Sequence, residues 1–538
     1  MARDKIPVLI QEILTARGYK NEEEIRSFLF SGISSLSDPF AIPALKQATE
    51  MLADAISQEK KIFLYGDGDV DGICAVFLIL SFMNGHGIKT PFYLTHRLDE
   101  NYEIETSFIN ELKETGYSIL ITMDCGISSI TALEQAEKVG IKCIIIDHHI
   151  GFPQQLPRSH IYINPFVDKW DNHIRYLSGA GITFKFIAGM EQLLPGGVMG
   201  KKVSDMFEVP CLATLADFVP LTGENRIFVK EGLKKIPFTS INGLQYMLNY
   251  YNIVSPISTR DIIMKINPKL NSPGRFGKPD ITLELLLENN MSEVEKLVEE
   301  IDTIDRERYK TVAKIMKEID TTSDDNNGFI LSENDYKGLS GIIASRLSEK
   351  YNRPFLVCYE KNNIIKGSIR TPEGYYFHNT SELKKYMDEI GGHQNAVGFK
   401  CSSVYADQLR NAWDATEWHT EEPKTYDCEL DIQNLTPRLI KEIFQYLEPF
   451  GKGNPVPVFL CRDVCIKNIR VENGPLKRCW IKKKECLFES IITDNIHIPV
   501  TEEKTDIYYT PYIKESNGLY RIFLKIYGLK NHRFSAGG

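Results

Sequence analysis

Side chains able to bind a cation gather in four short stretches of the sequence, each directly after an apolar run. They are Asp67, Asp69 and Asp71 in GDGDVDG, Asp124 in TMDCG, Asp147, His148 and His149 in IDHHI, and Asp217 in LATLADF. So many carboxylates cannot stay charged together uncompensated, because like charges repel and raise one another's pKa. Carboxylate oxygens with one or two imidazoles suit Mn²⁺, or less well Mg²⁺, and no cysteine ligand favours zinc. Two such ions, about 3.5–4 Å apart and sharing a carboxylate, would activate water and stabilise a phosphoryl displacement.

Each stretch alone also has a simpler explanation. A DxDxDG sequence can form a calcium loop, but the EF-hand pattern needs a Glu later in the loop, and no such spacing occurs here. A His-His pair is usually structural, and an Asp at the end of a strand is often a turn former. Single motif matches carry a high risk of false positives, so it is the joint occurrence of all four that favours a metal site.

The first three stretches each close a short β-branched run that reads as a strand. The runs are residues 61–67 (KIFLYGD), 118–124 (SILITMD) and 142–149 (KCIIIDHH), and an apolar helix over residues 73–83 follows the first. Alternating β and α segments predict a parallel sheet with helices on both faces. Because the carboxyl ends of parallel strands share the edge at which ligands bind, we expect all four stretches to converge there.

A length of 538 residues requires several domains. We predict an N-terminal helical segment over residues 1–48, the sheet domain over 49–279, a connecting helix over 280–325, a smaller α/β domain over 326–418 and a β-barrel over 423–538. The connecting helix follows from apolar residues at helical spacing without Gly or Pro. The smaller domain includes a helix over 341–351, a strand over 354–359 and a turn at GGHQ, residues 391–394. Short aromatic-rich strands from about Phe459 indicate the barrel.

The composition argues against a membrane span, a secretion signal and a generally basic surface. The longest strongly apolar run, residues 75–83, is too short to cross a bilayer, and the N-terminus has no signal-peptide pattern. Eleven irregularly spaced cysteines indicate free thiols in a reducing cytoplasm. The net charge is −9, but residues 461–533 carry 14 basic and 9 acidic residues. A local basic module on an acidic enzyme is compatible with a polyanionic substrate.

The four stretches resemble the DHH phosphoesterase superfamily, whose namesake triplet corresponds to residues 147–149. GIIASRLSEKYNRP (341–354), GSIRT (367–371) and GGHQNAVGF (391–399) resemble its associated DHHA1 domain. NSPGRFGKPD (271–280) resembles a RecJ segment, and EPFGKGNPVPVF (448–459) resembles the lead into the RecJ OB-fold. The resemblance covers almost the whole chain. It implies an α/β fold, with a parallel-sheet DHH domain and a smaller α/β DHHA1 domain joined by a long helix, plus a C-terminal OB-like β-barrel.

The resemblance also implies roles for individual residues. The metal ligands would be Asp67, Asp69, Asp71, Asp124, His148 and Asp217. The catalytic set would be Asp124 as the bridging carboxylate, His149 and His393. Asp147 would orient the histidines from behind, as second-shell carboxylates do. Substrate contacts would come from Asn271, Arg275, Ser368, Arg370, Gly391 and Gly392, with Arg97 and Arg346 as further candidates that could equally be structural ion-pair residues.

The OB-like module contains KRCWIKKK, residues 477–484, in which basic side chains surround an aromatic one. Trp480 and Lys482 could bind a single strand, because such folds combine a basic groove with stacking platforms. The alternative is a solvated basic hairpin with Trp480 in the barrel core, since Trp is often buried.

We therefore expect a metal-dependent phosphodiester hydrolase that trims single-stranded DNA from the 5′ end to mononucleotides, in DNA repair or recombination. Two Mn²⁺ ions would serve it, with Mg²⁺ possible as a substitute. A single-strand-binding protein or a helicase could be a partner, and no membrane is implied. Two departures from the family pattern, ENYE at 100–103 and YKGLSG at 336–341, leave the metal site intact but put the substrate path in doubt.

Two rival functions remain open. One is a nanoRNA or cyclic-dinucleotide phosphodiesterase of the same superfamily, although such enzymes usually lack an OB-like extension. The other is a non-catalytic replication or repair scaffold, although such relatives tend to lose metal ligands. A dinucleotide assay separates the first, and binding without hydrolysis under Mn²⁺ would indicate the second.

Overall fold

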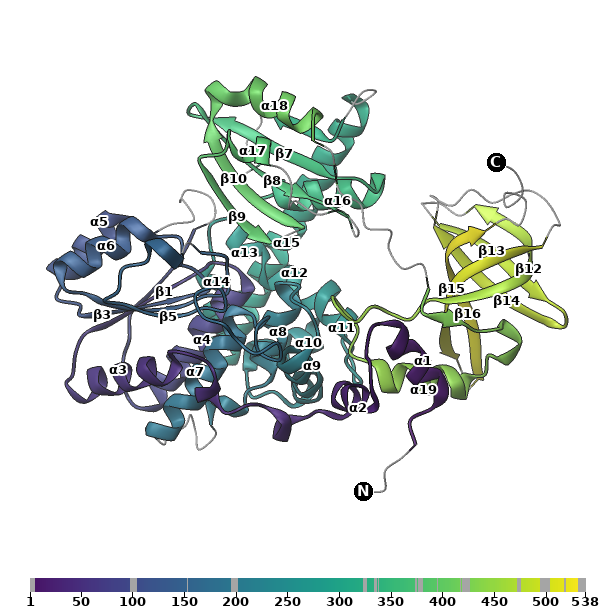
Figure 1. Ribbon diagram of the computed structural model, residues 1–538, viewed down its shortest axis with the longest axis horizontal. Helices are drawn as coiled ribbons and strands as arrows, with labels where there is room; N and C mark the ends of the chain where they lie inside the picture. Colours follow the sequence, from purple (N-terminus) through teal and green to yellow (C-terminus); the bar gives the residue numbers. More distant parts are fainter. Residues whose placement is uncertain are drawn as a thin grey trace. The chain divides into compact units, whose positions relative to one another are not determined.

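The chain folds into two compact parts in the computed structural model (Figure 1). It describes residues 5–96, 104–151, 153–194, 202–322, 327–332, 336, 338–372, 375, 381–393, 395–416, 418, 426–471, 476–493, 504–516 and 519–530. One part is Gly32–Glu422, and the other joins Met1–Ser31 to Pro423–Gly538. The predicted N-terminal segment over residues 1–48 is therefore divided between the two parts rather than standing alone.

The first sheet is parallel throughout, as predicted. Its order is β2-β1-β3-β4-β5, with the strands β1 (Ile62–Gly66), β2 (Phe92–Leu94), β3 (Ile119–Met123), β4 (Lys142–Ile146) and β5 (Ile161–Ile163). Alternate residues along each strand enter two different cores, which places helices on both faces. Figure 1 shows α5 (Thr106–Glu114) and α6 (Ile130–Val139) on one face, with α3 (Leu45–Ser57) and α7 (Gly179–Leu193) on the other.

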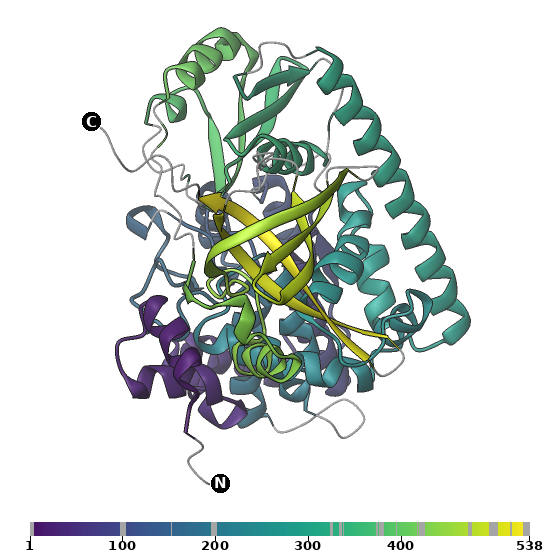
Figure 2. The ribbon, with the colours of Figure 1, turned by 90° about the vertical axis from the view of Figure 1, so that its right-hand side faces the viewer.

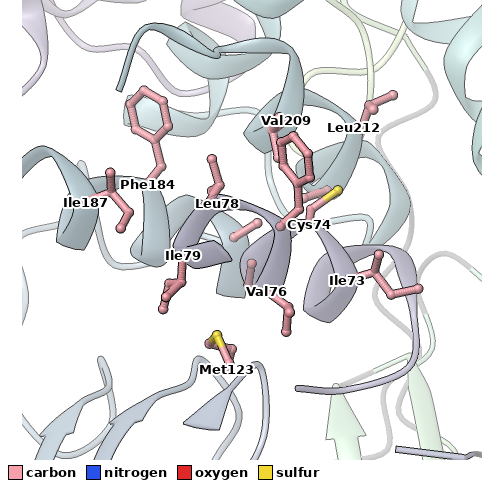
Figure 3. Packing of buried hydrophobic residues seen from close by; sticks show 14 of the residues in the cluster. Ile73, Cys74, Val76, Leu78, Ile79, Met123, Phe184, Ile187, Val209 and Leu212 are labelled. Atoms are coloured by element: carbon pink, nitrogen blue, oxygen red, sulfur yellow. The ribbon is translucent and has the colours of Figure 1, made fainter. Parts of the chain in front are cut away.

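Helix α4 (Val70–Gly85) is the centre of this domain. Residues 70–83 are all buried, which explains a sequence that is apolar on every side rather than along one stripe. Figure 3 shows its side chains among Phe184 and Ile187 of α7, Val209 and Leu212 of α8 (Glu208–Ala216), and Met123 of β3. The first turn of α4 is thereby fixed against the carboxyl edge of the sheet.

Further helices complete the domain and lead to the second sheet. They are α9 (Gly223–Lys235), α10 (Asn242–Tyr250), α11 (Thr259–Asp261), α12 (Asn267–Leu270), α13 (Ser272–Arg275), α14 (Asp280–Leu287) and α15 (Met291–Thr322). The predicted connecting helix over residues 280–325 is thus two helices, because the chain leaves the helical conformation at Glu288 (ψ 134°). Figure 2 shows the long α15 extending from the helices of the first domain toward the second sheet.

The second sheet is mixed, with the order β6-β7-β8-β10-β9. Its strands are β6 (Phe329–Ser332), β7 (Phe355–Lys361), β8 (Ile364–Arg370), β9 (Glu389–His393) and β10 (Ala396–Ser402), accompanied by α16 (Ser340–Tyr351), α17 (Ser381–Lys384) and α18 (Ala406–Asp414). The prediction of a turn at GGHQ was wrong for its first three residues, which end strand β9 and pair with β10. Two adjacent glycines usually indicate a turn, but here they lie in a strand that pairs antiparallel with β10.

The C-terminal part is the predicted barrel. It contains β11 (Cys428–Glu429), β12 (Phe459–Val471), β13 (Leu476–Lys483), β14 (Cys486–Thr493), β15 (Thr505–Ser516) and β16 (Leu519–Lys530), and pairing of β12 with β15 closes it. Helices α1 (Val8–Ala16), α2 (Glu22–Phe30) and α19 (Pro437–Leu447) share its apolar core. The Arg17 guanidinium donates to both carboxylate oxygens of Asp427, at 2.9 and 3.0 Å, and to Asn454, so the N-terminal helices are integral to this part.

All eleven cysteines are free thiols, as their spacing predicted. Among the described residues, no helix is both long and apolar enough to cross a membrane.

Candidate metal centre and substrate-binding residues

The first acidic stretch turns from strand β1 into helix α4. Asp67 follows the strand, and its carboxylate accepts a 2.6 Å hydrogen bond from Thr95 Oγ1. Asp69 caps the helix and accepts the backbone N–H groups of Asp71 and Gly72, at 2.9 and 3.1 Å. A carboxylate is favourable here because the N-terminus of a helix carries partial positive charge. The DxDxDG spacing thus places three carboxylates within one turn of chain.

The second and third stretches end the next two strands of the sheet. Asp124 follows β3 with φ 60°, and its N–H donates to the carbonyl of Ile146 at the end of β4. The left-handed region is uncommon for a residue other than Gly, and such strain concentrates at functional sites. His148 follows β4 two residues after Ile146, so parallel pairing brings it beside Asp124.

Asp217 reaches the same place by a different route. It is the C-cap of helix α8, so the apolar run before it is a helix and not a strand. The apolar run before it is helical because α8 packs against α4 and α9, and residues 209–215 are all buried. A short apolar run without Gly does not distinguish a buried helix from a buried strand.

The four stretches converge around His148. Its Nε2 atom lies 3.1 Å from Asp124 Oδ1, 3.6 Å from Asp217 Oδ2 and 3.8 Å from Asp71 Oδ2. Possible ligand atoms form three groups, and within each group the atoms lie within 4.8 Å of one another. The groups are Asp71, His148 and Asp217, then Asp67, Asp69 and Asp124, then Asp124, His148 and His149. Asp124 therefore belongs to two of the three groups.

Burial makes this cluster unfavourable without a counter-charge. Burial, followed by the negative charges of Asp71, Asp69, Asp67 and Asp217, raises the pKa of Asp124 well above its ordinary value. Burial and the charges of Asp217 and Asp69 likewise raise the pKa of Asp71, against two backbone hydrogen bonds that favour its ionised form. Asp124 Oδ1 is buried and, within the described part of the chain, accepts no hydrogen bond. Divalent cations fit such a donor set, because they supply the missing charge.

Asp71 fixes helix α7 as well as facing His148. Its two oxygens accept the backbone N–H groups of Gly179 and Ala180, each at 2.7 Å. A Cβ on Gly179 would lie 2.7 Å from Oδ1 of Asp124, so only glycine fits there. The sequence reading missed Gly179 and Thr95. SGAG before an apolar run signals a helix start and could have indicated Gly179, whereas nothing in the sequence marks Thr95.

Asp147 lies behind the histidines. Its Oδ1 atom accepts the N–H of His149 and lies 2.8 Å from His149 Nδ1, while Oδ2 accepts the N–H of Ile127. Burial alone would lower the pKa of His149, but Asp147 and the more distant Asp217 and Asp67 raise it to about 9. Asp147 thus restrains the ring of His149, which stays one-third exposed.

Asn271 and Arg275 lie at the ends of α13, which a buried charge network holds. Asn271 connects α12 to α13, and Arg275 ends α13 and donates to the carbonyl of Gly338 at 3.1 Å. Gly338 has φ 65°, and a Cβ there would lie 2.2 Å from the Arg275 carbonyl oxygen. The departure YKGLSG therefore provides a close backbone contact to Arg275.

The network itself is centred on Asp305 of α15. Asp305 accepts hydrogen bonds from Ser272 and Arg308 and lies 3.2 Å from Lys269 Nζ. Burial alone would raise the pKa of Asp305, but the Ser272 hydrogen bond and the charges of Arg308 and Lys269 hold it below its ordinary value. The segment that carries Arg275 is thereby attached to the connecting helix.

Ser368 and Arg370 lie together on strand β8, next to the first turn of α16. A Cβ on Gly341 of α16 would lie 2.8 Å from Arg370 Nη2 and 3.4 Å from Ser368 Oγ. A hydroxyl, a guanidinium and the amino end of a twelve-residue helix are all suited to phosphate oxygens. Arg346, on the same helix, lies over the ring of Tyr309 at 5.1 Å, an arrangement that favours its structural reading.

Three predicted residues can be placed only in part. Gly391, Gly392 and His393 form the end of β9, where His393 is opposite Ala396 in the neighbouring strand. Arg97 lies outside the described residues, as do Asn101 and Glu103 of the ENYE departure.

Trp480 is 37% exposed on the barrel, so the alternative prediction that it lies in the barrel core is wrong. It alternates along β13 with buried Cys479 and Ile481, and Lys482 is exposed on the same side. Its cross-strand neighbours are Lys467 on β12 and Glu489 on β14. The face around Trp480 is therefore basic and aromatic, but Glu489 interrupts it.

Comparison with known proteins agrees with this architecture. The model of the DHH family, N-terminal domain, matches residues 61–214, and that of the RecJ OB domain matches residues 426–527. The chain therefore carries a DHH-family domain and a RecJ OB domain, and it is similar to RecJ proteins. It is 28% identical over 480 residues to the single-stranded-DNA-specific exonuclease RecJ of Bacillus subtilis, and 26% identical over 483 residues to that of Haemophilus influenzae.

These alignments cover 86% and 84% of the chain, but 60% of the Bacillus relative and 82% of the Haemophilus relative. The structure of RecJ in complex with Mn²⁺ from Thermus thermophilus superposes with a TM-score of 0.78 at 21% identity, covering 99% of this chain and 79% of that one. A second structure of that protein is in complex with Mg²⁺, with a TM-score of 0.73. The structural likeness establishes the fold.

Proposed function

We propose that the protein is a divalent-metal-dependent exonuclease that hydrolyses single-stranded DNA from the 5′ end to mononucleotides. The observation that carries the proposal is that buried Asp124 belongs to both a carboxylate group with Asp67 and Asp69 and a mixed group with His148 and His149. A shared carboxylate between two ligand groups is the arrangement of a two-metal phosphoesterase site. The exonuclease names of the relatives support the choice of substrate.

Asp67, Asp69 and Asp124 would hold one cation, and Asp71, His148 and Asp217 with Asp124 would hold the other. Oxygen-rich ligands with one imidazole suit Mn²⁺ or Mg²⁺. Such ions, when bound, supply the Lewis acidity that activates water and neutralises charge on phosphoryl oxygens. His149, raised in pKa by Asp147, is partly exposed and can donate a proton or a hydrogen bond to the substrate.

Other residues would bind and position the single-stranded DNA. Ser368 and Arg370 would bind phosphate at the amino end of α16, with Arg275 and Asn271 contributing from α13. His393 would contact the scissile phosphate, and Gly391 and Gly392 would let the strand approach the backbone closely. Trp480 and Lys482 would stack on and attract the single strand as it crosses the barrel. A single-strand-binding protein or a helicase as partner, and a role in DNA repair or recombination, stay predictions.

The test uses single-stranded oligonucleotides labelled at either end, with Mn²⁺ or with EDTA. The wild type should release the 5′ label as a mononucleotide at the earliest times, while the 3′-labelled strand shortens progressively, and only with the metal. Asp124→Asn should abolish both effects, whereas Asp54→Asn, an exposed aspartate on α3, should behave as the wild type. Release of the 3′ label first would overturn the polarity. Hydrolysis confined to dinucleotides would overturn the exonuclease proposal.

A further inference from the structure

Four large apolar side chains are exposed on loops that carry residues of the carboxylate cluster or are hydrogen-bonded to those loops. They are Ile150 at 61%, Phe166 at 41%, Tyr176 at 49% and Phe218 at 54% exposure. Ile150 directly follows His149, and Phe218 directly follows Asp217, so both lie one residue from a predicted site residue. Exposed apolar residues that gather in one place, rather than singly, mark sites of interaction.

Hydrogen bonds connect these loops to one another. Asn164 donates to the carbonyl of His149 at 2.9 Å and accepts the N–H of Phe166 at 2.7 Å. Asn225 donates to the carbonyls of both Tyr176 and Pro220, which joins the loop after β5 to the loop that contains Phe218. The apolar side chains are therefore carried by a fixed rim rather than by independent loops.

Phe218 has an unfavourable backbone conformation, and its side chain is not buried in a way that would offset this cost. Its φ is 59°, in the left-handed region that is a genuine outlier for a bulky residue. Its side chain stays more than half exposed. Strained residues persist where the surrounding structure determines them, and they cluster at ligand-binding positions. An exposed aromatic held in this way beside a carboxylate of the metal cluster indicates a contact with substrate.

We propose that Phe218 stacks on the base of the nucleotide that is being removed, with Ile150, Phe166 and Tyr176 completing an apolar rim for that base. The inference rests on the proposed function, because a phosphate held at the carboxylates brings its own sugar and base to this rim. Stacking is tolerant of sequence, as every base has a π-face, and so it suits an enzyme that removes any nucleotide in turn.

The test is a double comparison of substrate and enzyme. Two single-stranded oligonucleotides differ only in whether the 5′-terminal nucleotide carries a base or is abasic. For the wild type, loss of the base should lower kcat/KM roughly tenfold, since stacking on one aromatic contributes on that scale. Phe218→Ala should lower kcat/KM for the ordinary strand by about the same factor and should no longer distinguish the two substrates. Phe218→Tyr, which keeps the ring, should retain the discrimination.

Phe238→Ala is the matched control, because Phe238 is 83% exposed and ends the short helix η5 (Ile236–Phe238), which follows the opposite end of α9 from Asn225. It should leave both rates unchanged. Equal rates of the wild type on the two substrates, or full discrimination by Phe218→Ala, would overturn the inference while hydrolysis itself upholds the proposed function. A wild type that hydrolyses neither strand would overturn the proposed function and this inference with it.

Discussion

Replacing Asp124 by Asn should stabilise the metal-free protein and weaken its response to metal. The side chain is 3% exposed, and its oxygens lie within 4.8 Å of ligand atoms of Asp67 and Asp69. Asn keeps the shape of the side chain and removes its charge. The substitution thus separates the electrostatic cost of the cluster from its packing.

The expected size follows from these distances. Two unit charges 4.8 Å apart repel by about 3.5 kcal/mol at an effective dielectric constant of about 20. Protonation, which the raised pKa of Asp124 favours, removes part of that repulsion. We therefore expect Asp124→Asn to raise the free energy of unfolding by about 1–3 kcal/mol in EDTA. Mn²⁺ at a hundred times its Kd should add about 2.7 kcal/mol to the wild type.

Calorimetry with EDTA and with Mn²⁺ provides the assay. The variant should melt above the wild type in EDTA, and Mn²⁺ should raise the Tm of the variant by less than it raises that of the wild type. Asp54→Asn, which is exposed on α3, should follow the wild type under both conditions. A variant that melts below the wild type in EDTA, or that gains as much from Mn²⁺ as the wild type, would refute the electrostatic reasoning.

Three further substitutions test how the site and the domain are held. Gly179→Ala should lower the rate of hydrolysis at least 100-fold, because the new Cβ would lie 2.7 Å from Asp124 Oδ1 and displace that carboxylate. Gly181→Ala, whose Cβ would have no contact shorter than 3.5 Å, should stay active in the same assay. Lys185→Met should lower the free energy of unfolding in urea by about 3–5 kcal/mol, because it leaves the buried carboxylate of Glu224 without its counter-charge. Lys234→Met, in an exposed pair with Glu231, should lower it by less than about 1 kcal/mol. Equal losses would contradict this. Asp305→Asn should reduce the free energy of unfolding at pH 7. Folding lowers the pKa of Asp305, so its contribution to the free energy of unfolding is complete above about pH 4 and is lost as the pH falls further. The difference in free energy of unfolding between the wild type and Asp305→Asn should therefore be the same at about pH 7 and pH 5, and a smaller difference at the lower pH would refute the assignment.

Much of the catalytic sheet could be predicted from the sequence. Asp67, Asp124 and His148 each follow a β-branched run, and parallel strands bring such positions to one edge whatever their separation along the chain. Asp217 was also predicted at the site, because it too follows an apolar run, although that run does not end a strand. Its apolar run is a buried helix, and periodicity alone does not separate the two.

What the sequence could not provide was contact between distant segments. The closeness of Gly179 to Asp124 depends on how α7 meets α4, and the Asp305 network depends on how α15 crosses α13. Met1–Ser31 reads as an ordinary helical segment, yet Arg17 and the apolar faces of α1 and α2 complete the core of the barrel part. Such pairings follow from the packing of whole faces, which local spacing does not encode.

Counting Mn²⁺ ions by electron paramagnetic resonance, during titration of the metal-free protein, shows whether two ions share the Asp124 carboxylate. We predict two ions per chain whose spins are coupled, because both would use the Asp124 carboxylate, and loss of the coupled signal in Asp124→Asn. A wild type that binds a single ion, or two ions without coupling, would contradict the claim that one shared carboxylate organises the site.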